Sequence, residues 1–401
     1  MPWKEVTAVN ERMQFVARLK AGERMSDLCE EYGISRKTGY KFEKRYDEHG
    51  PNGLYDFSRR PIRLARQISP GIQTAILELK REKPTWGAAK LQEVLQRRHP
   101  EMDLPVRSTI HDLLDRHGLV KKRSKRRRYH AYPTLQDQDI RAANQLWCAD
   151  YKGQFRMKNA KYCYPLTVSD FHSRYLLGCE AMESTRSESA KQGFEMIFSE
   201  YGLPTRIRTD NGGPFSSRSV QGLSPLSVWW MRLGIQVERI EPGQPQQNGR
   251  HERMHRTLKG EVLPGVSRNL LEQQEQLDRF REDFNQRRPH EALKMRCPAD
   301  LYKPSLRRFP KTLPEPNYPH HDMVKHVTSS GYVYFRNEKT FFLSSAIAGQ
   351  SIGLEEEQDS IWRINFMDLD LGFLDEQTMK FTPISPEESF QRISSPSREN
   401  S

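Results

Sequence analysis

The stretch Pro242-Gly-Gln-Pro-Gln-Gln-Asn-Gly-Arg-His-Glu252-Arg-Met-His-Arg-Thr-Leu-Lys259 decides the fold of the middle of this 401-residue chain. It predicts a loop rich in proline and glycine that opens into a charged helix containing Glu252. Two apolar runs upstream each end in an aspartate, Trp147-Cys-Ala-Asp150 and Ile207-Arg-Thr-Asp210. The sequence therefore predicts two acids at strand ends and a third acid on a flanking helix.

The residues around these acids alternate between strand-like and helix-like patterns. Three short strands joined by turns come first, and helix and strand then alternate along the chain. We expect strands at 146–151, 162–168, 175–179, 206–209 and 235–240, and helices at 187–201, 226–233 and 270–287. This order predicts a mixed α/β sheet.

Asp150, Asp210 and Glu252 form a carboxylate set suited to hard divalent cations. Mg²⁺ prefers oxygen ligands and usually takes only a few protein carboxylates alongside substrate phosphates. Two such ions about 3.5–4 Å apart can activate the attacking oxygen and stabilise the leaving oxygen of a phosphoryl displacement. Glu252, Arg256 and Lys259 share one helical face, so the two cations would line the groove beside the metal site.

Four segments carry a resemblance to a known family: Trp147 to Asp150, Ile207 to Gly212, Pro242 to Lys259, and Asn285-Gln-Arg-Arg-Pro-His-Glu-Ala-Leu293. They resemble insertion-sequence transposases with a retroviral-integrase-type catalytic core, and the resemblance covers most of the chain. It implies a ribonuclease H-like fold and a catalytic and metal-binding DDE triad carried onto Asp150, Asp210 and Glu252. It also implies two Mg²⁺ or Mn²⁺ ions, and cleavage and strand transfer of DNA.

Two departures from the family pattern are visible. The gap between Asp210 and Glu252 holds 41 residues, which is longer than in compact members, and the excess matches the Ser/Gly/Pro-rich stretch 216–227. Retroviral integrases also carry an N-terminal His/Cys zinc module, which nothing in this sequence matches. Neither departure alters the three acids.

The formal net charge of +12 lies at the front of the chain. Residues 1–130 carry +12, residues 131–320 carry +6 and residues 321–401 carry −6. A basic front end indicates a polyanionic partner, most simply nucleic acid. We therefore expect the DNA contacts to begin in the N-terminal third.

Residues 10–46 predict three short helices with a sharp turn at Gly33, which is the outline of a helix-turn-helix. Asn10, Ser26 and Ser35 are the expected helix caps. The third helix offers the residue types that contact base edges and phosphates. Its predicted DNA-binding residues are Ser35, Arg36, Lys37, Thr38, Tyr40 and Lys41.

Residues 68–120 repeat this plan less cleanly, with apolar stripes on three helices and Ser108 and Thr109 at the start of the third. We interpret them as a second helix-turn-helix-like DNA-binding domain. A run of cations follows, too dense in like charge for a stable helix, and we expect it to bind phosphates as an extended arm. The arm consists of Lys121, Lys122, Arg123, Lys125, Arg126, Arg127 and Arg128.

The C-terminal end changes character again. Prolines at 304–322 predict a linker, and the short alternating runs of 323–382 predict a small all-β barrel, SH3-like by the same resemblance. The predicted division is 1–56 and 68–120 for the DNA-binding domains, 121–140 for the basic linker, 141–303 for the core, then 304–322, 323–382 and a disordered tail at 383–401.

Two alternatives compete with a transposase. His251-Glu252-Arg253-Met254-His255 matches the H-E-x-x-H helix of zinc proteases, with Glu272 or Glu275 as a downstream ligand, although the surrounding cations suit phosphate better than Zn²⁺. A helix-turn-helix regulator with an inert core is the second. Asp170 is interpreted as turn chemistry, and Trp229 and Trp230 as core packing.

We expect a transposase that acts on double-stranded DNA, both element ends and target, as a homo-oligomer. Five scattered cysteines without a CxxC pair indicate a reducing compartment, and no apolar run reaches the length of a membrane span. These features favour a cytoplasmic, nucleoid-associated protein of a prokaryote without a membrane partner.

Overall fold

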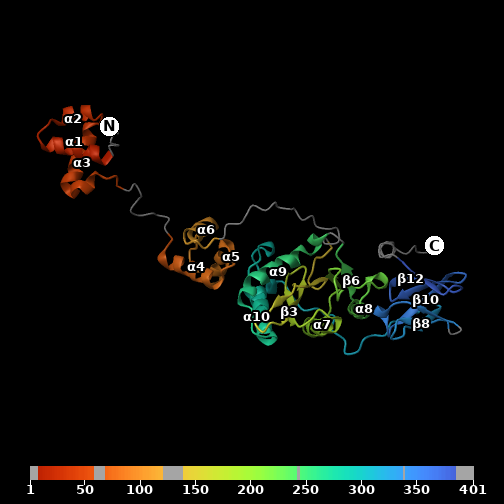
Figure 1. The fold of residues 1–401 in the computed structure, drawn as a ribbon. Helices are drawn as coiled ribbons and strands as arrows, with labels where there is room; N and C mark the ends of the chain where they lie inside the picture. The colour runs from red at the N-terminus through yellow and green to blue at the C-terminus, as the bar shows by residue number, and fades with distance from the viewer. Residues whose placement is uncertain (1–7, 58–67, 121–138, 242–243, 337–338, 385–401) are drawn as a thin grey trace, which may run out of the picture. The chain divides into compact units, whose positions relative to one another are not determined.

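The computed structural model describes residues 8–57, 68–120, 139–241, 244–336 and 339–384 (Figure 1). The basic run Lys121–Arg128 and residues 385–401 of the predicted tail lie outside these ranges. The chain divides into two compact units, Met1–Ile68 and Ser69–Ser401. No helix among the described residues is long and apolar enough to cross a membrane.

The first unit contains α1 (Ala8–Lys20), α2 (Met25–Glu31), α3 (Arg36–His49) and a 3-10 turn (Gly50–Leu54) around one apolar cluster. Of the expected caps, Ser35 is confirmed, because its hydroxyl accepts the backbone N–H of Thr38. The other two are wrong. Helix α1 already begins at Ala8, before Asn10, and α2 begins one residue before Ser26 with Arg24 at its N-cap.

The second helical module contains α4 (Pro70–Glu82), α5 (Ala88–Arg98) and α6 (Arg107–Arg116), as the apolar stripes predict. Polar bonds join it to the core. Lys83 pairs with Asp283 at 2.6 Å, Thr85 donates to Glu261 at 2.5 Å, and Arg97 donates to the carbonyl of Met295 at 2.8 Å. The module is therefore docked on the core rather than tethered only by a linker.

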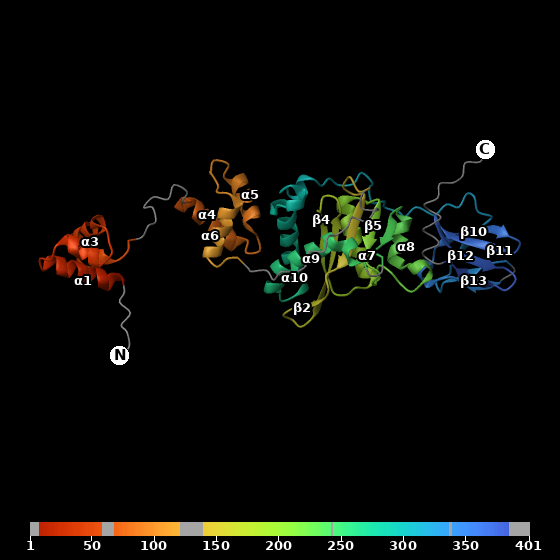
Figure 2. The ribbon, with the colours of Figure 1, turned by 90° about the horizontal axis from the view of Figure 1, so that it is seen from above.

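The core is a mixed sheet with helices on both faces (Figures 1 and 2). Strands β3 and β4 pair antiparallel beside β1, whereas β5 and β6 run parallel to it, in the order β4-β3-β1-β5-β6 with β2 added to β3. The strand bounds are β1 (Leu146–Tyr151), β2 (Phe155–Arg156), β3 (Tyr162–Asp170), β4 (Leu176–Met182), β5 (Arg206–Thr209) and β6 (Gln236–Arg239).

Two apolar clusters separate the helices. Helices α7 (Ser187–Tyr201) and α8 (Pro225–Arg232) pack on one face with Trp147 and Ile207, and Trp229 and Trp230 lie in this cluster as predicted. Helices α9 (Gly249–Glu261) and α10 (Leu270–Glu282, continued by a π-turn to Arg287) pack on the other face with Leu176 and Cys179. The α/β sheet with helices on both sides is thus confirmed.

The C-terminal region is all-β. Strands form a five-stranded sheet, β13-β12-β11-β10-β7, and a separate hairpin, β8-β9, among the described residues. Their bounds are β7 (Met323–His326), β8 (Tyr332–Tyr334), β9 (Thr340–Phe342), β10 (Ser351–Gln358), β11 (Ile361–Phe366), β12 (Leu369–Asp375) and β13 (Lys380–Pro383).

The insertion that lengthens the Asp210–Glu252 gap packs on this β region. Leu223 and Val228 are buried in its apolar cluster, and the Gln221 amide donates to the carbonyl of Ile384 at 2.9 Å. The proline-rich segment also contacts the core, because Arg307 donates to the carbonyls of Pro204 and Leu233. These contacts hold the β region against the core.

Candidate active site

Strand register brings Asp150 and Asp210 to the same edge of the sheet. Strands β1 and β5 are parallel neighbours in which Leu146 pairs with Arg206 and Cys148 with Arg208. Continuing that register two residues places Asp150 beside Asp210, where both strands end. Asp150 lies on the sheet face that α9 covers, because alternate residues of a strand point to opposite faces and Trp147 and Ala149 occupy the α7 side.

Glu252 belongs to the exposed face of α9, which crosses this edge. The three carboxyl groups act on one another electrostatically. Burial is the main cause that raises the pKa of Asp150 from 3.8 to about 7, and the charges of Asp210 and Glu252 raise it further, whereas Lys152 lowers it. Two like charges, Asp210 and Glu252, therefore act on the half-buried Asp150.

The loop after β5 holds Asp210 by its own backbone. The N–H of Gly212 donates to Oδ1 of Asp210 at 3.2 Å, and a Cβ on Gly212 would lie 3.1 Å from the other carboxylate oxygen. Glycine is thus needed for this close approach. Asn211, the next residue of this loop, donates its side-chain amide to the carbonyl of Ile240 at 3.0 Å.

The opposite face of α9 is buried and polar. Nε2 of His251 and Nε2 of His255 lie 2.8 and 2.7 Å from the Thr167 hydroxyl, which also donates to the Asp150 carbonyl at 2.9 Å. Nδ1 of His251 lies 2.8 Å from the Ser169 hydroxyl. Burial lowers the pKa of His251 to about 3, and burial with the nearby His251 lowers that of His255 to about 2.

This arrangement overturns the zinc-protease alternative. His251 is 1% exposed, and both imidazoles face the sheet while Glu252 faces solvent on the other side of the helix. Nδ1 of His255 lies 3.6 Å from Oδ2 of Asp150, and the lowered pKa of that imidazole disfavours an ion pair between them. Among the described residues, no three His, Cys, Asp or Glu side chains stand close enough to hold a metal ion unaided.

Cations surround the exposed face of α9. Arg256 and Lys259 are exposed beside Glu252, as the helical spacing predicts. The sequence analysis missed Arg174, which follows the β3–β4 turn with φ of +63°. Burial and the charges of Arg250 and Arg253 lower its pKa to about 10, and its side chain forms no hydrogen bond or ion pair with the described residues. The sequence predicted only a turn here and did not indicate that Arg174 lies near Arg250 and Arg253.

In the first unit, the start of α3 presents the predicted DNA-binding residues to solvent. Arg36, Lys37 and Lys41 are exposed, as are Ser35 and Tyr40, while Thr38 is half-buried. Gly39 faces inward, where a Cβ would lie 2.7 Å from the sulfur of Met25. Glycine therefore allows the close contact between α2 and α3 that a helix-turn-helix requires.

In the second module, Ser108 is exposed and Thr109 half-buried at the start of α6. Two buried cations lie where α5 meets the core. Burial and the charge of Arg288 lower the pKa of Lys90 to about 8, while Glu261 and Glu291 oppose this effect. Asn285 is buried against the sheet, where its side-chain oxygen accepts from the N–H of Leu176 and its NH₂ group donates to the carbonyl of Leu176.

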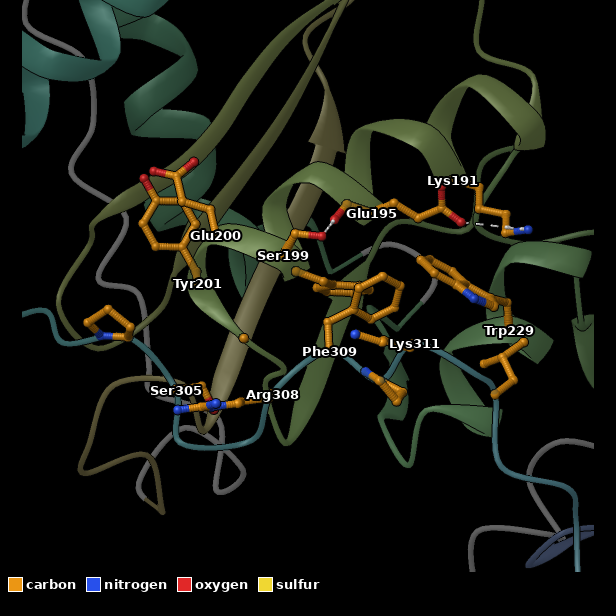
Figure 3. Close-up of a pocket in the computed structure, with 15 residues that line it drawn as sticks. Lys191, Glu195, Ser199, Glu200, Tyr201, Trp229, Ser305, Arg308, Phe309 and Lys311 are labelled. Carbon is orange, nitrogen blue, oxygen red and sulfur yellow. Dashed lines mark hydrogen bonds and ion pairs between the residues drawn. The ribbon is translucent and has the colours of Figure 1, made fainter.

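A cavity of about 800 Å³ lies away from the three acids, between α7, α8 and the proline-rich segment (Figure 3). Phe309 fills part of it beside Phe198 and Trp229, with ring centroids 5.9 and 6.2 Å apart. Nζ of Lys191 lies 5.8 Å from the Trp229 ring. The cavity thus marks where the proline-rich segment packs on the core, and none of the three acids lines it.

Comparison with known families agrees with this architecture. Two models described as "Integrase core domain" match residues 141–245 and 233–298, a "Helix-turn-helix domain" matches 11–62 and a "Homeodomain-like domain" matches 38–114. The chain carries an integrase core domain behind helix-turn-helix domains. The matched integrase core segments include all three candidate acids.

Relatives of this integrase core come from mobile elements and viruses. The chain is 26% identical over 256 residues to the insertion element IS476 uncharacterized 39.2 kDa protein of Xanthomonas euvesicatoria, which covers 62% of this chain and 70% of the relative. It is 23% identical to the insertion element IS407 uncharacterized 31.7 kDa protein of Burkholderia multivorans, with 56% and 78% covered. The Gag-Pol polyprotein of baboon endogenous virus is 36% identical over 25% of this chain and 5% of its own length.

Solved structures similar to the chain are also integrases. The HTLV-2 integrase catalytic core domain in complex with magnesium has 15% identity and a TM-score of 0.33, and covers 40% of this chain and 98% of its own. The simian T-cell lymphotropic virus intasome in complex with PP2A regulatory subunit B56 gamma has 17% identity and a TM-score of 0.35, and covers 74% and 97%.

Proposed function

We propose that this protein is a DDE transposase, a polynucleotidyl transferase that binds the terminal inverted repeats of a mobile element and carries out metal-dependent cleavage and strand transfer. The observation that carries the proposal is the gathering of Asp150, Asp210 and Glu252 at one edge of an integrase core, where the other two acids raise the pKa of Asp150. Burial is the main cause of that raised pKa, and a half-buried acid with like charges beside it is more typical of a functional site than of a structural one.

The chemistry of the three side chains, rather than their spacing in this structure, suits two Mg²⁺ or Mn²⁺ ions. All three side chains are carboxylates, which hard divalent cations prefer, and Glu252 is exposed to the surface from which DNA would approach. Bound there, the ions would activate the attacking oxygen and stabilise the leaving oxygen. Asp150, Asp210 and Glu252 would hold them, and a nearby cation favours the ionised form of Asp150 over the protonated form that its surroundings favour.

The residues around the acids would bind and orient DNA. Arg256 and Lys259 extend from Glu252 along the exposed face of α9, where they can contact phosphates on either side of the scissile bond. The start of α3, the start of α6 and the arm Lys121–Arg128 would recognise the element ends. We further propose a homo-oligomer on DNA at the nucleoid, with an SH3-like acidic β region that serves multimerisation rather than DNA binding.

A strand-transfer assay tests the proposal. The substrate is a labelled duplex carrying the inverted repeats that flank the coding region, with supercoiled plasmid as target and Mg²⁺ or Mn²⁺ added. Alanine at Asp150, Asp210 or Glu252 should lower cleavage and joining at least about 1000-fold, equivalent to some 4 kcal/mol in the barrier, and leave end binding intact. The control is Glu275→Ala, an exposed acid of α10.

The outcomes separate the candidates. Metal-dependent joining that persists in any of the three alanine variants contradicts the triad assignment. Binding of the ends by wild-type protein without any cleavage favours the alternative, a helix-turn-helix regulator with an inert core. Loss of joining in Glu275→Ala would mean that the assay responds to the loss of any acid and does not single out the three candidates.

A further inference from the structure

Helix α9 carries Glu252 on one face and a buried polar contact to Asp150 on the other. The Thr167 hydroxyl lies at the centre of that contact, within 3 Å of the Asp150 carbonyl and of one nitrogen in each of His251 and His255. It therefore joins strand β1, strand β3 and helix α9 at one atom. These are the elements that set where Asp150 and Glu252 stand relative to each other.

We propose that Thr167 is a positioning residue, and that its bonds to His251, His255 and the Asp150 carbonyl fix Asp150 relative to Glu252 for metal binding. The inference rests on the proposed function, because it takes these two acids as metal ligands. Thr167 itself touches neither metal nor DNA and acts through its neighbours.

The number of hydrogens and lone pairs on each group determines which atom donates in each hydrogen bond of this network. A threonine hydroxyl has one hydrogen to donate and two lone pairs to accept with. The Asp150 carbonyl can only accept, so the single hydrogen goes to it, and both imidazoles must donate from Nε2. All three partners are then satisfied at once, which is the arrangement that buried polar groups require.

The wiring has a consequence for the Asp150 carboxylate. Nδ1 of His251 lies 2.8 Å from the Ser169 hydroxyl, which ties the same ring to strand β3. Nδ1 of His255 lies 3.6 Å from Oδ2 of Asp150, beyond hydrogen-bond distance. The network therefore braces Asp150 through its backbone carbonyl and leaves its carboxylate without a hydrogen bond from either imidazole.

Substitutions at Thr167 separate the hydroxyl from the shape of the side chain. Thr167→Val keeps the shape and removes the hydroxyl, whereas Thr167→Ser keeps the hydroxyl. Thr257→Val on α9 is the matched control, because the Thr257 hydroxyl bonds only the Arg253 carbonyl of its own helix. The full-length chain is used throughout, with Mn²⁺ as the probe.

Two readouts are measured on each variant. The first is the Mn²⁺ concentration that gives half of the metal-induced rise in melting temperature, and the second is the Mn²⁺ concentration for half-maximal strand transfer. Thr167→Val should raise both by at least about tenfold, as loss of outer-shell partners of metal ligands commonly does. Thr167→Ser should restore values close to wild type, and Thr257→Val should leave them unchanged.

Each contrary result overturns the inference. A Thr167→Val protein that melts lower but keeps the wild-type Mn²⁺ dependence shows a merely structural hydroxyl. A serine variant as impaired as the valine variant shows that the methyl group, not the hydroxyl, matters. If Thr167→Val does not fold, Ser169→Ala removes the outermost bond instead and should raise both concentrations about threefold, as loss of one buried hydrogen bond does, and unchanged values contradict the proposal.

The two readouts also distinguish this inference from the proposed function. A wild-type protein that gains stability from Mn²⁺ but joins no DNA defeats the transposase proposal and leaves the positioning inference to be decided by melting temperature. A wild-type protein whose melting temperature does not respond to Mn²⁺ defeats the positioning inference, because no metal site exists for Thr167 to organise.

Discussion

Two aspartates at opposite ends of the paired strands β1 and β3 have opposite surroundings. Asp170 is 1% exposed, and its carboxylate accepts from the backbone N–H of Asn144 at 2.7 Å and from the N–H and hydroxyl of Ser173 at 2.7 and 2.5 Å. The Asp150 side chain is 22% exposed and is approached by the negative charges of Asp210 and Glu252.

The difference shows that one pair of strands, β1 and β3, can hold both a structural acid and a candidate functional acid. Burial raises the pKa of both groups, but donors at Asp170 offset that cost inside the protein, whereas like charges at Asp150 add to it. The carboxylate of Asp170 is therefore satisfied by hydrogen bonds from within the protein. Around Asp150 the Tyr151 backbone and Lys152 lower the pKa, but they do not offset burial and the two neighbouring acids.

The largest effect on stability is expected at Asp170, whose carboxylate accepts three hydrogen bonds. Asp170→Asn replaces one accepting oxygen by an NH₂ group that faces N–H donors, so the free energy of unfolding should fall by about 3 kcal/mol, the cost of lost charge-assisted bonds and an unsatisfied donor. Urea unfolding followed by tryptophan fluorescence measures it. The exposed Asp139→Asn is the control, and a loss at Asp170 below about 1 kcal/mol would show that its three bonds add little to stability.

At Asp150, by contrast, substitution should raise the free energy of unfolding, and the gain should depend on pH. Because the folded-state pKa of Asp150 is raised from 3.8 to about 7, its contribution to stability falls as pH rises through that window and is fully unfavourable above it. In metal-free buffer, Asp150→Asn should therefore exceed wild type by about 2 kcal/mol at pH 8, and this gain should shrink toward pH 5. Melting curves at both pH values test this, and a gain independent of pH would contradict the cause.

Much of the core followed from the sequence. The bounds of α7 (Ser187–Tyr201) and β5 (Arg206–Thr209) match the prediction to the residue, because one has a clean 3.6-residue apolar period and the other is a buried run closed by Asp210. The three candidate acids also fell where the strand ends and the charged helix predicted. Local periodicity is sufficient where an element has one apolar face and clear breakers.

The remaining features depend on partners distant in sequence. The inward direction of His251 and His255 depends on Thr167 and Ser169, more than 80 residues upstream, so the H-E-x-x-H spacing alone suggested ligands rather than hydrogen bonds. The stretch 216–227 looked like a surplus loop because Val220 and Leu223 pack against a β region far along the chain.

The smallest predicted effect concerns charge at the open end of the ladder. Arg256 is exposed one helical turn beyond Glu252, so Arg256→Gln should remove one phosphate contact and reduce the salt dependence of element-end binding, the slope of log K against log salt, by about 0.9. Lys303→Gln is the matched control, an exposed cation whose backbone carbonyl bonds Asn144 near the Asp170 end. Fluorescence anisotropy titrations between about 50 and 200 mM salt measure both slopes. Several phosphate contacts change the binding affinity by at least about tenfold over this range, so the slopes can be compared. Equal slopes in the two variants would mean that DNA contacts Arg256 no more than it contacts Lys303.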